Sequence, residues 1–228
     1  MTGTIINCLT IVVGALIGTF IVKRIPDSVR DSVMYAISLA VVLIGLRTAW
    51  DAPDFVVLII SLALGALLGE TAQLDDRLNA VAKRLERRFG AQSAGTFAKG
   101  FVTASLVFGV GAMAVMGALE NGLTGRYDTL LAKSALDGIS SIVFSSAFGI
   151  GVAFSAIPIL IYQGGISLLA SWIQPFLSDP VVAQMSAVGG LLIAAIGLNM
   201  LGATEVKVAN LLPGILVGAV LMVLRTTI

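Results

Sequence analysis

The sequence predicts an all-α integral membrane protein of about eight transmembrane helices that form an inverted-topology internal repeat. The 228-residue chain is 57% hydrophobic and only 12% charged, whereas an ordinary soluble domain is about a quarter charged. Long stretches contain no Asp, Glu, Lys or Arg: 1–22, 100–119, 138–178, 180–204 and 208–224. In addition, segments of the first half of the chain resemble segments of the second half.

A helix that crosses a bilayer needs about 20 apolar residues. We therefore expect a single transmembrane domain over 1–228, with spans near 4–22, 33–50, 54–71, 98–118, 134–152, 157–175, 181–201 and 208–225. The uncharged run 138–178 is about twice one span, so it must turn within itself, and Gly151–Pro158 is the expected place. Residues 1–22 have no basic segment before the apolar run, so we expect a retained helix rather than a signal peptide.

The long connection 72–97 differs from the apolar spans because it is rich in charged residues. Apolar residues recur there at helical spacing among basic ones: Leu78, Val81, Leu85 and Phe89 among Arg77, Lys83, Arg84, Arg87 and Arg88. This pattern predicts a cytoplasmic amphipathic helix that lies on an anionic leaflet. A solvated connector is the alternative, since charge runs are often simply exposed.

Basic residues set the expected orientation. With eight spans, ten of the 14 Lys and Arg residues fall on one side of the membrane and four on the other. The positive-inside rule then places both termini outside the cytoplasm. The turn Glu120–Asp128 faces outward in the same arrangement.

The internal similarity is the most specific pattern in the chain. Residues 25–46 align with 177–198 at an offset of 152, and 64–68 align with 217–221 after one inserted residue. The first three spans thus resemble the last three, and span four resembles span five. An odd number of crossings separates the members of each pair, so they run in opposite directions, as in many secondary transporters. Chance similarity between apolar helices is the alternative.

One intramembrane carboxylate is the leading candidate for function. Asp137 lies one turn inside the expected fifth span, and Lys133 is four residues earlier on the same helical face. Charged residues inside a membrane usually face a cavity or a partner. The pair therefore predicts a proton or cation relay, or a substrate contact, although both residues could instead anchor the helix at interface depth.

Small residues accompany this pair along the fifth span. Ser134, Gly138, Ser141, Ser145 and Gly149 form a stripe typical of close helix packing, whereas Ser140 lies off the stripe and is the better cavity candidate. Other polar residues in or beside the spans complete the predicted substrate-binding set with Asp137 and Ser140: Thr103, Ser105, Glu120, Asn121, Gln163 and Asn199. Asn7 is a further cavity candidate. The glycines of span four either break that helix or act as packing notches.

Several classes of function are not expected. A net charge of +1 does not suit nucleic-acid binding, which needs a basic face. No histidine and one cysteine make a zinc or haem site unexpected, and we expect no cofactor. No pairing of a nucleophile with a base is visible, so we do not expect an enzyme.

The chain resembles a known family in several separate motifs. These are 117–125 (GALENGLTG), 130–138 (LLAKSALDG), 161–165 (IYQGG), 196–199 (IGLN) and 208–213 (VANLLP), within a resemblance that runs from Thr4 to the C-terminus. On these residues the chain is similar to the bacterial DUF554 proteins, of the YqgA/YdfK type. The resemblance implies a multi-pass protein of the bacterial cytoplasmic (inner) membrane, and it implies no particular substrate.

Two functional classes follow. The first is a secondary transporter of a small polar solute or ion, with a site between spans four and five and alternating access of one repeat against the other. The second is an ion or solute channel, or a membrane scaffold that does not transport and that holds partners through residues 75–89. The lipid bilayer is the expected partner in either class, and small-residue faces allow a homodimer.

Overall fold

The computed structural model describes the backbone of residues 1–22, 27–89 and 96–227; the side chains of 21–31, 33, 82, 85–89 and 227 lie outside the description. Within these limits the chain is helical and contains no strand. Five segments are long and apolar enough to cross a membrane: Thr2–Phe20, Phe55–Ala72, Asp128–Leu168, Asp179–Met200 and Val208–Thr226. A bent pair, Thr96–Gly109 with Ala112–Thr124, would make a sixth, and Met34–Trp50 is a shorter apolar helix.

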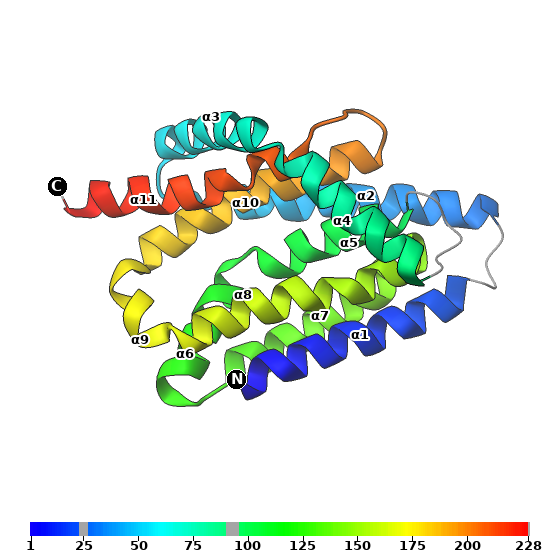
Figure 1. Cartoon of the computed structure of the whole chain (residues 1–228), viewed down its shortest axis with the longest axis horizontal. Coiled ribbons are helices and arrows are strands. Elements are labelled where there is room, and N and C mark those ends of the chain that lie inside the picture. Colours follow the sequence, from blue (N-terminus) through cyan, green and yellow to red (C-terminus); the bar gives the residue numbers. More distant parts are fainter. Residues whose placement is uncertain (23–26, 90–95, 228) are drawn as a thin grey trace. The chain divides into compact units, whose positions relative to one another are not determined.

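The chain divides into two compact units. Unit 1 comprises Met1–Ile37, Val81–Gly109 and Met113–Ile173, and unit 2 comprises Ser38–Ala80, Val110–Ala112 and Gln174–Ile228. Unit 1 contains α1 (Thr2–Val22), α5 (Thr96–Gly109), α6 (Ala112–Thr124), α7 (Asp128–Phe148), the 3₁₀ segment η1 (Gly149–Ser155), α8 (Ala156–Leu168) and α9 (Ala170–Ile173) (Figure 1). Unit 2 contains most of α2 (Asp27–Trp50), α3 (Phe55–Ala72), the start of α4 (Leu74–Phe89), η2 (Gln174–Phe176), α10 (Asp179–Met200), η3 (Val208–Leu211) and α11 (Pro213–Thr227).

Helices α1 and α7 pack side by side and run in the same direction. Gly3 contacts Leu130, and further along both helices a Cβ on Gly14 would overlap the carbonyl oxygen of Gly138. The Ser141 hydroxyl donates to the Ile11 carbonyl oxygen at 2.6 Å. The predicted packing role of the small-residue stripe is therefore confirmed, because only small side chains allow two backbones to approach this closely.

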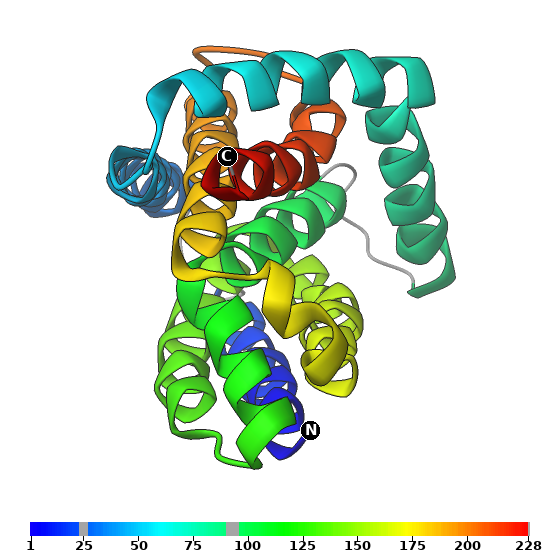
Figure 2. The same ribbon diagram turned by 90° about the vertical axis from the view of Figure 1, so that its left-hand side faces the viewer.

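Helices α5 and α6 form a bent pair of apolar helices. They meet at an angle of 63°, and Gly111 between them has φ +127°, which L side chains rarely adopt. Phe97 at the start of α5 contacts Gly151, whereas Asn121 near the end of α6 contacts Met1, so the bent pair runs opposite to α1. Figure 2 shows α6 ending beside the N-terminal end of α1.

The expected turn inside residues 138–178 is confirmed at η1. Helix α7 ends at Phe148, Gly149 has φ +74°, and the 3₁₀ segment then leads into α8. Helix α7 begins at Asp128, six residues before the expected start of the span near 134. Asp137 is therefore about two and a half turns inside α7 rather than one.

In unit 2, α3 packs against α11 in the opposite direction. A Cβ on Gly65 would overlap Gly214, and one on Gly69 would overlap the backbone of Asn210. At one end, Asp54 caps α3 by accepting hydrogen bonds from the N–H groups of Val56 (2.7 Å) and Val57 (3.0 Å) and forms an ion pair with Arg225. The Asp54 carboxylate therefore both caps α3 and ties this end of it to α11.

The contacts between α2 and α10 are reciprocal. A Cβ added to Gly45 would meet the backbone of Gly190 and of Ala194 in α10. A Cβ added to Gly197 would meet Ser38 and Val42 of α2, which are the residues 152 positions before Gly190 and Ala194. Exchange of the two helices at the offset of 152 therefore maps this contact set onto itself.

Helix α4 confirms the helical part of the connector prediction, since residues 74–89 are α-helical. Arg77 and Arg84 are exposed, and Val81 on the apolar side is 48% exposed. The side chains of Leu85, Arg87, Arg88 and Phe89, on which the amphipathic pattern also rests, lie outside the described residues. Its placement on a leaflet stays a prediction.

Candidate functional site

A buried group of polar side chains lies where α1, α7 and α8 meet in unit 1. The Lys133 Nζ donates to Asp137 Oδ2 at 2.6 Å, and the Asn7 Nδ2 donates to the same oxygen at 3.0 Å. The Asn7 Nδ2 also donates to Gln163 Oε1 at 3.3 Å, which extends the network from α7 through α1 to α8. We call these four residues, together with Thr4, the polar cluster.

The polar cluster is almost fully removed from solvent. Lys133 and Asp137 are each 6% exposed, and Thr4, Asn7 and Gln163 are 0% exposed. A lone charge at this depth would be expensive in a bilayer, and pairing makes the two charges neutral as a unit. The burial of Asp137 among protein atoms therefore favours a partner-facing carboxylate over an anchor at the headgroups.

Three polar atoms of the cluster have no hydrogen-bond partner among the described residues. They are Thr4 Oγ1, Asn7 Oδ1 and Gln163 Nε2. Buried polar atoms are nearly always paired, and leaving one unpaired costs about 1–3 kcal/mol. The cluster thus presents two oxygen acceptors and one N–H donor that a bound polar species would satisfy.

Three of the predicted site residues come together in this cluster: Lys133, Asp137 and Gln163. Asn7, predicted as a further cavity residue, is its central member because it bonds both Asp137 and Gln163. Ser140 follows Asp137 by three residues on α7 and is half-buried. Thr4 was missed by sequence reasoning; the available signal was its position one turn before Asn7 on the same helical face.

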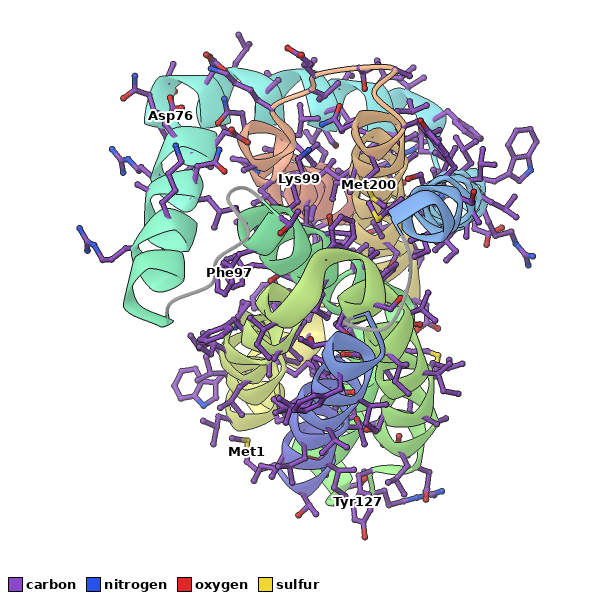
Figure 3. The ribbon with its side chains drawn as sticks, turned by 90° about the vertical axis from the view of Figure 1, so that its right-hand side faces the viewer. Met1, Asp76, Phe97, Lys99, Tyr127 and Met200 are labelled. Atoms are coloured by element: carbon purple, nitrogen blue, oxygen red, sulfur yellow. The ribbon has the colours of Figure 1, made fainter. Side chains whose placement is uncertain are left out.

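Glu120 and Asn121 lie apart from the cluster, at the turn between α6 and α7. The Asn121 side chain accepts from the Met1 ammonium at 2.6 Å and donates to the carbonyl oxygen of Arg126 at 3.1 Å. Met1 and Tyr127, labelled in Figure 3, mark the end of unit 1 at which α1 and α7 both begin. Asn121 therefore holds this turn against the start of α1.

The charges of this turn are largely exposed. Arg126 pairs with Asp128 at 3.0 Å and with Glu120 at 3.8 Å. The hydrogen bonds that Arg126 donates to Asp128, together with the nearby negative charges, raise the pKa of the Arg126 guanidinium above its ordinary value. Such an exposed group suits a water-facing turn better than a buried binding site.

The two span-four candidates lie on α5. Thr103 is 3% exposed, and the Ser105 hydroxyl donates to the carbonyl oxygen of Phe101 at 2.6 Å within its own helix. Helix α5 packs against η1 and the end of α7, where Gly100 meets Phe148. These residues are thus placed further along α7 than Asp137, and no hydrogen bond between α5 and the polar cluster is present among the described residues.

Asn199 belongs to unit 2 and its side chain organises a loop. Its Oδ1 accepts from the Thr204 hydroxyl at 2.7 Å and from the Val206 N–H at 2.9 Å, and its Nδ2 donates to the Val206 carbonyl oxygen. All three bonds are local to the turn after α10. They account for the half-buried Asn199 side chain without a ligand.

The described residues contain no group of three or more His, Cys, Asp or Glu side chains that could hold a metal ion. The chemistry available to the polar cluster is therefore that of one carboxylate, one ammonium, two amides and a hydroxyl. These groups can bind a small polar solute or a hard cation, and they can exchange a proton.

Comparison with known proteins gives the chain its family. Residues 2–223 match the family described as "Protein of unknown function (DUF554)". The chain is 36% identical over 226 residues to "Uncharacterized membrane protein YdfK" of Bacillus subtilis (strain 168), covering 97% of this chain and 96% of that one. It is 32% identical over 220 residues to "Uncharacterized protein YqgA" of Escherichia coli (strain K12), with 94% and 93% covered.

No solved structure matches the chain. The family match spans nearly the whole chain, as the motifs around Glu120, Asp137, Gln163 and Asn199 predicted. Together with the long apolar helices and the relative named as a membrane protein, this confirms the predicted membrane class. The chain is a multi-pass membrane protein that belongs to the DUF554 family.

Proposed function

We propose that this protein is a secondary transporter of the bacterial inner membrane that carries a small polar solute or ion. The observation that carries the proposal is the polar cluster, in which a Lys133–Asp137 ion pair is buried among helices that are otherwise apolar. Ionisable groups inside a membrane are expensive and usually mark the path of a substrate, an ion or a proton.

The unpaired atoms of the cluster support the same reading. Asn7 Oδ1, Gln163 Nε2 and Thr4 Oγ1 come from two helices and offer both donor and acceptor capacity. A purely structural ion pair has no need of buried polar groups that lack partners, because each of them lowers stability. A bound solute would form hydrogen bonds with these atoms, and this role explains why the protein keeps them despite the lost stability.

The helix contacts support an inverted repeat. The reciprocal contacts of α2 with α10 are those that a pseudo-twofold axis in the membrane plane would produce. The contacts between α3 and α11 are reciprocal as well. A Cβ added to Gly65 would meet Gly214, and a Cβ added to Gly218, the residue that aligns with Gly65, would meet Ser61, which aligns with Gly214. We infer eight spans, α5 with α6 counting as one broken span, and alternating access of the repeats.

Broken spans support a transport role as well. Discontinuous helices near a site are common in secondary transporters, where the freed backbone groups line a cavity. The break at Gly149 falls in unit 1, the unit that holds the polar cluster, and a second break follows Gly109, the last residue of α5. We further propose, from the basic-residue count, that both termini are extracytoplasmic, and that the protein is not an enzyme.

Uptake into proteoliposomes tests the transport proposal. Wild type, Asp137→Asn and Lys133→Met are compared against a panel of small polar solutes, with Asp128→Asn as the control because it removes a carboxylate from the exposed start of the same helix. We expect at least one solute to be concentrated by wild type and by the control but not by the two cluster variants.

The same assay separates the alternatives. Flux that equilibrates the solute without concentrating it, and that ignores imposed ion gradients, would indicate a channel. A scaffold predicts no flux for any solute and loss of partner binding when the charged face of α4 is removed. Concentrative uptake that is unchanged in Asp137→Asn would remove the polar cluster from the mechanism.

A further inference from the structure

We propose that the polar cluster binds a monovalent metal cation, Na⁺, through Thr4 Oγ1, Asn7 Oδ1 and the Asp137 carboxylate. The inference rests on the proposed transport function and names its coupling ion. It concerns side chains of α1 and α7 within unit 1, where the oxygen atoms and the competing ammonium of Lys133 are all buried.

The orientation of the Asn7 amide is the first step. Its Nδ2 donates to Asp137 Oδ2 at 3.0 Å and to Gln163 Oε1 at 3.3 Å. The reversed amide would set a carbonyl oxygen against an ionised carboxylate and against a second carbonyl, where neither contact has a proton to share. Asn7 Oδ1 therefore takes part in neither bond, and it has no partner among the described residues.

Thr4 supplies the second unpaired oxygen. It lies three residues before Asn7 on α1, so the two side chains share one face of the helix about one turn apart. Its hydroxyl is fully buried and has no partner within the described part of the chain, whereas the Thr10 and Thr19 hydroxyls of the same helix donate to backbone carbonyl oxygens at 2.9 and 2.7 Å. The unpaired hydroxyl is thus particular to the cluster end of α1.

A carboxylate, an amide oxygen and a hydroxyl form a ligand set for a hard cation. Cations of this kind prefer oxygen ligands, while the nitrogen and sulfur ligands favoured by transition metals do not occur in the cluster. The one remaining unpaired atom, Gln163 Nε2, is a donor and therefore suits an oxygen of the carried solute rather than the cation.

The positive charge of Lys133 favours a monovalent over a divalent cation at this site. Its ammonium lies 2.6 Å from Asp137 Oδ2, so the buried pair is neutral. A monovalent cation that takes the place of this ammonium keeps Asp137 paired, but the displaced ammonium stays buried, so the site gains one positive charge. A divalent cation would add a further buried positive charge, which is costly at this depth. Lys133 is thus a built-in competitor that reclaims Asp137 when Na⁺ leaves.

Binding of radioactive ²²Na⁺ to the purified full chain in lipid nanodiscs tests the inference. Unlabelled NaCl is titrated against choline chloride at constant ionic strength. We expect saturable binding to wild type that is about tenfold or more weaker in Thr4→Val, which replaces the unpaired hydroxyl with a methyl group of similar shape. Thr19→Val is the matched control, because its hydroxyl already bonds the Ala15 carbonyl oxygen.

A second variant and a folding measurement complete the design. Lys133→Met removes the competing ammonium and should strengthen Na⁺ binding. In choline chloride, the melting temperature of Thr4→Val should equal or exceed that of wild type, since the change deletes an unpaired polar group without breaking a bond. Loss of binding in this variant would then not be loss of fold.

The outcomes separate this inference from the transport proposal. Absence of saturable ²²Na⁺ binding to wild type, or wild-type affinity in Thr4→Val, overturns the cation site. Concentrative solute uptake that does not depend on Na⁺ would also overturn the cation site, but it would support the transport function. Saturable Na⁺ binding without uptake of any solute would instead support the site and overturn the transport function.

Discussion

The buried Lys133–Asp137 ion pair makes the sharpest stability prediction. The two side chains are 7% and 9% exposed and their charged atoms are 2.6 Å apart. Coulomb's law with an effective dielectric constant of about 20 gives roughly 6 kcal/mol of attraction at that distance. Much of this attraction only offsets the cost of removing the two charges from water.

The single and double variants should therefore behave very differently. Lys133→Met leaves an unpaired carboxylate and Asp137→Asn leaves an unpaired ammonium, so each should lower the free energy of unfolding by about 3–5 kcal/mol. The double variant leaves no buried charge and should lie within about 1–2 kcal/mol of wild type, because similarly shaped uncharged groups often replace a buried pair at little cost.

A double-mutant cycle measured by unfolding in mixed micelles provides the assay. Arg126→Met is the control: its ion pair with Asp128 is exposed, so its unfolding midpoint should match that of wild type. Additive single effects, or single variants as stable as the control, would contradict the view that the pair is buried and coupled in the folded protein.

Three further predictions concern packing, a second polar network and topology. Gly14→Val should lower the free energy of unfolding by about 1–3 kcal/mol or more, because the valine side chain would overlap the Gly138 backbone. Gly165 in α8 has open space around it, so the control Gly165→Ala should be as stable as wild type or more stable by about 0.5–1 kcal/mol. Thermal unfolding measures both. Asn210→Leu should lower stability in the same assay by about 1–2 kcal/mol, since it removes the amide that donates to the Glu70 carboxylate at 2.5 Å and accepts from the Asp75 N–H at 2.8 Å. In a cysteine-free background, an impermeant maleimide added to intact cells should label Thr124→Cys but not Ala203→Cys, and the reverse pattern would contradict the proposed orientation.

Much of the helical layout was predictable from sequence, because apolar length is a local property. The uncharged run 138–178 had to turn, and the turn at Gly149–Ser155 overlaps the predicted Gly151–Pro158. Helix α7 begins six residues before the expected start of the fifth span, since Asp128 and Lys133 indicated a water-facing turn. Lysine side chains are exposed in most helices, and a buried lysine is uncommon. Lys133 therefore moved the expected start of the span toward the C-terminus.

The candidate site was only partly predictable. Asp137 and Lys133 share one helix at a spacing of four, so their pairing follows from helix geometry alone. Asn7 and Gln163 could be recognised as polar residues in apolar spans, but not as neighbours of Asp137. Asn199 looked equivalent to them in sequence, yet its side chain bonds the loop that follows it. Polarity within a span does not distinguish these roles.

By itself, the sequence determined the membrane class, the helical architecture and the family, because each depends on composition, apolar length or linear motifs. Only the tertiary structure decided which polar residues meet. Small residues let α1 approach α7 closely, and this packing brings Asn7 against a carboxylate 130 positions later in the chain. Because such contacts depend on how helices pack rather than on local spacing, the polar cluster became visible only in three dimensions.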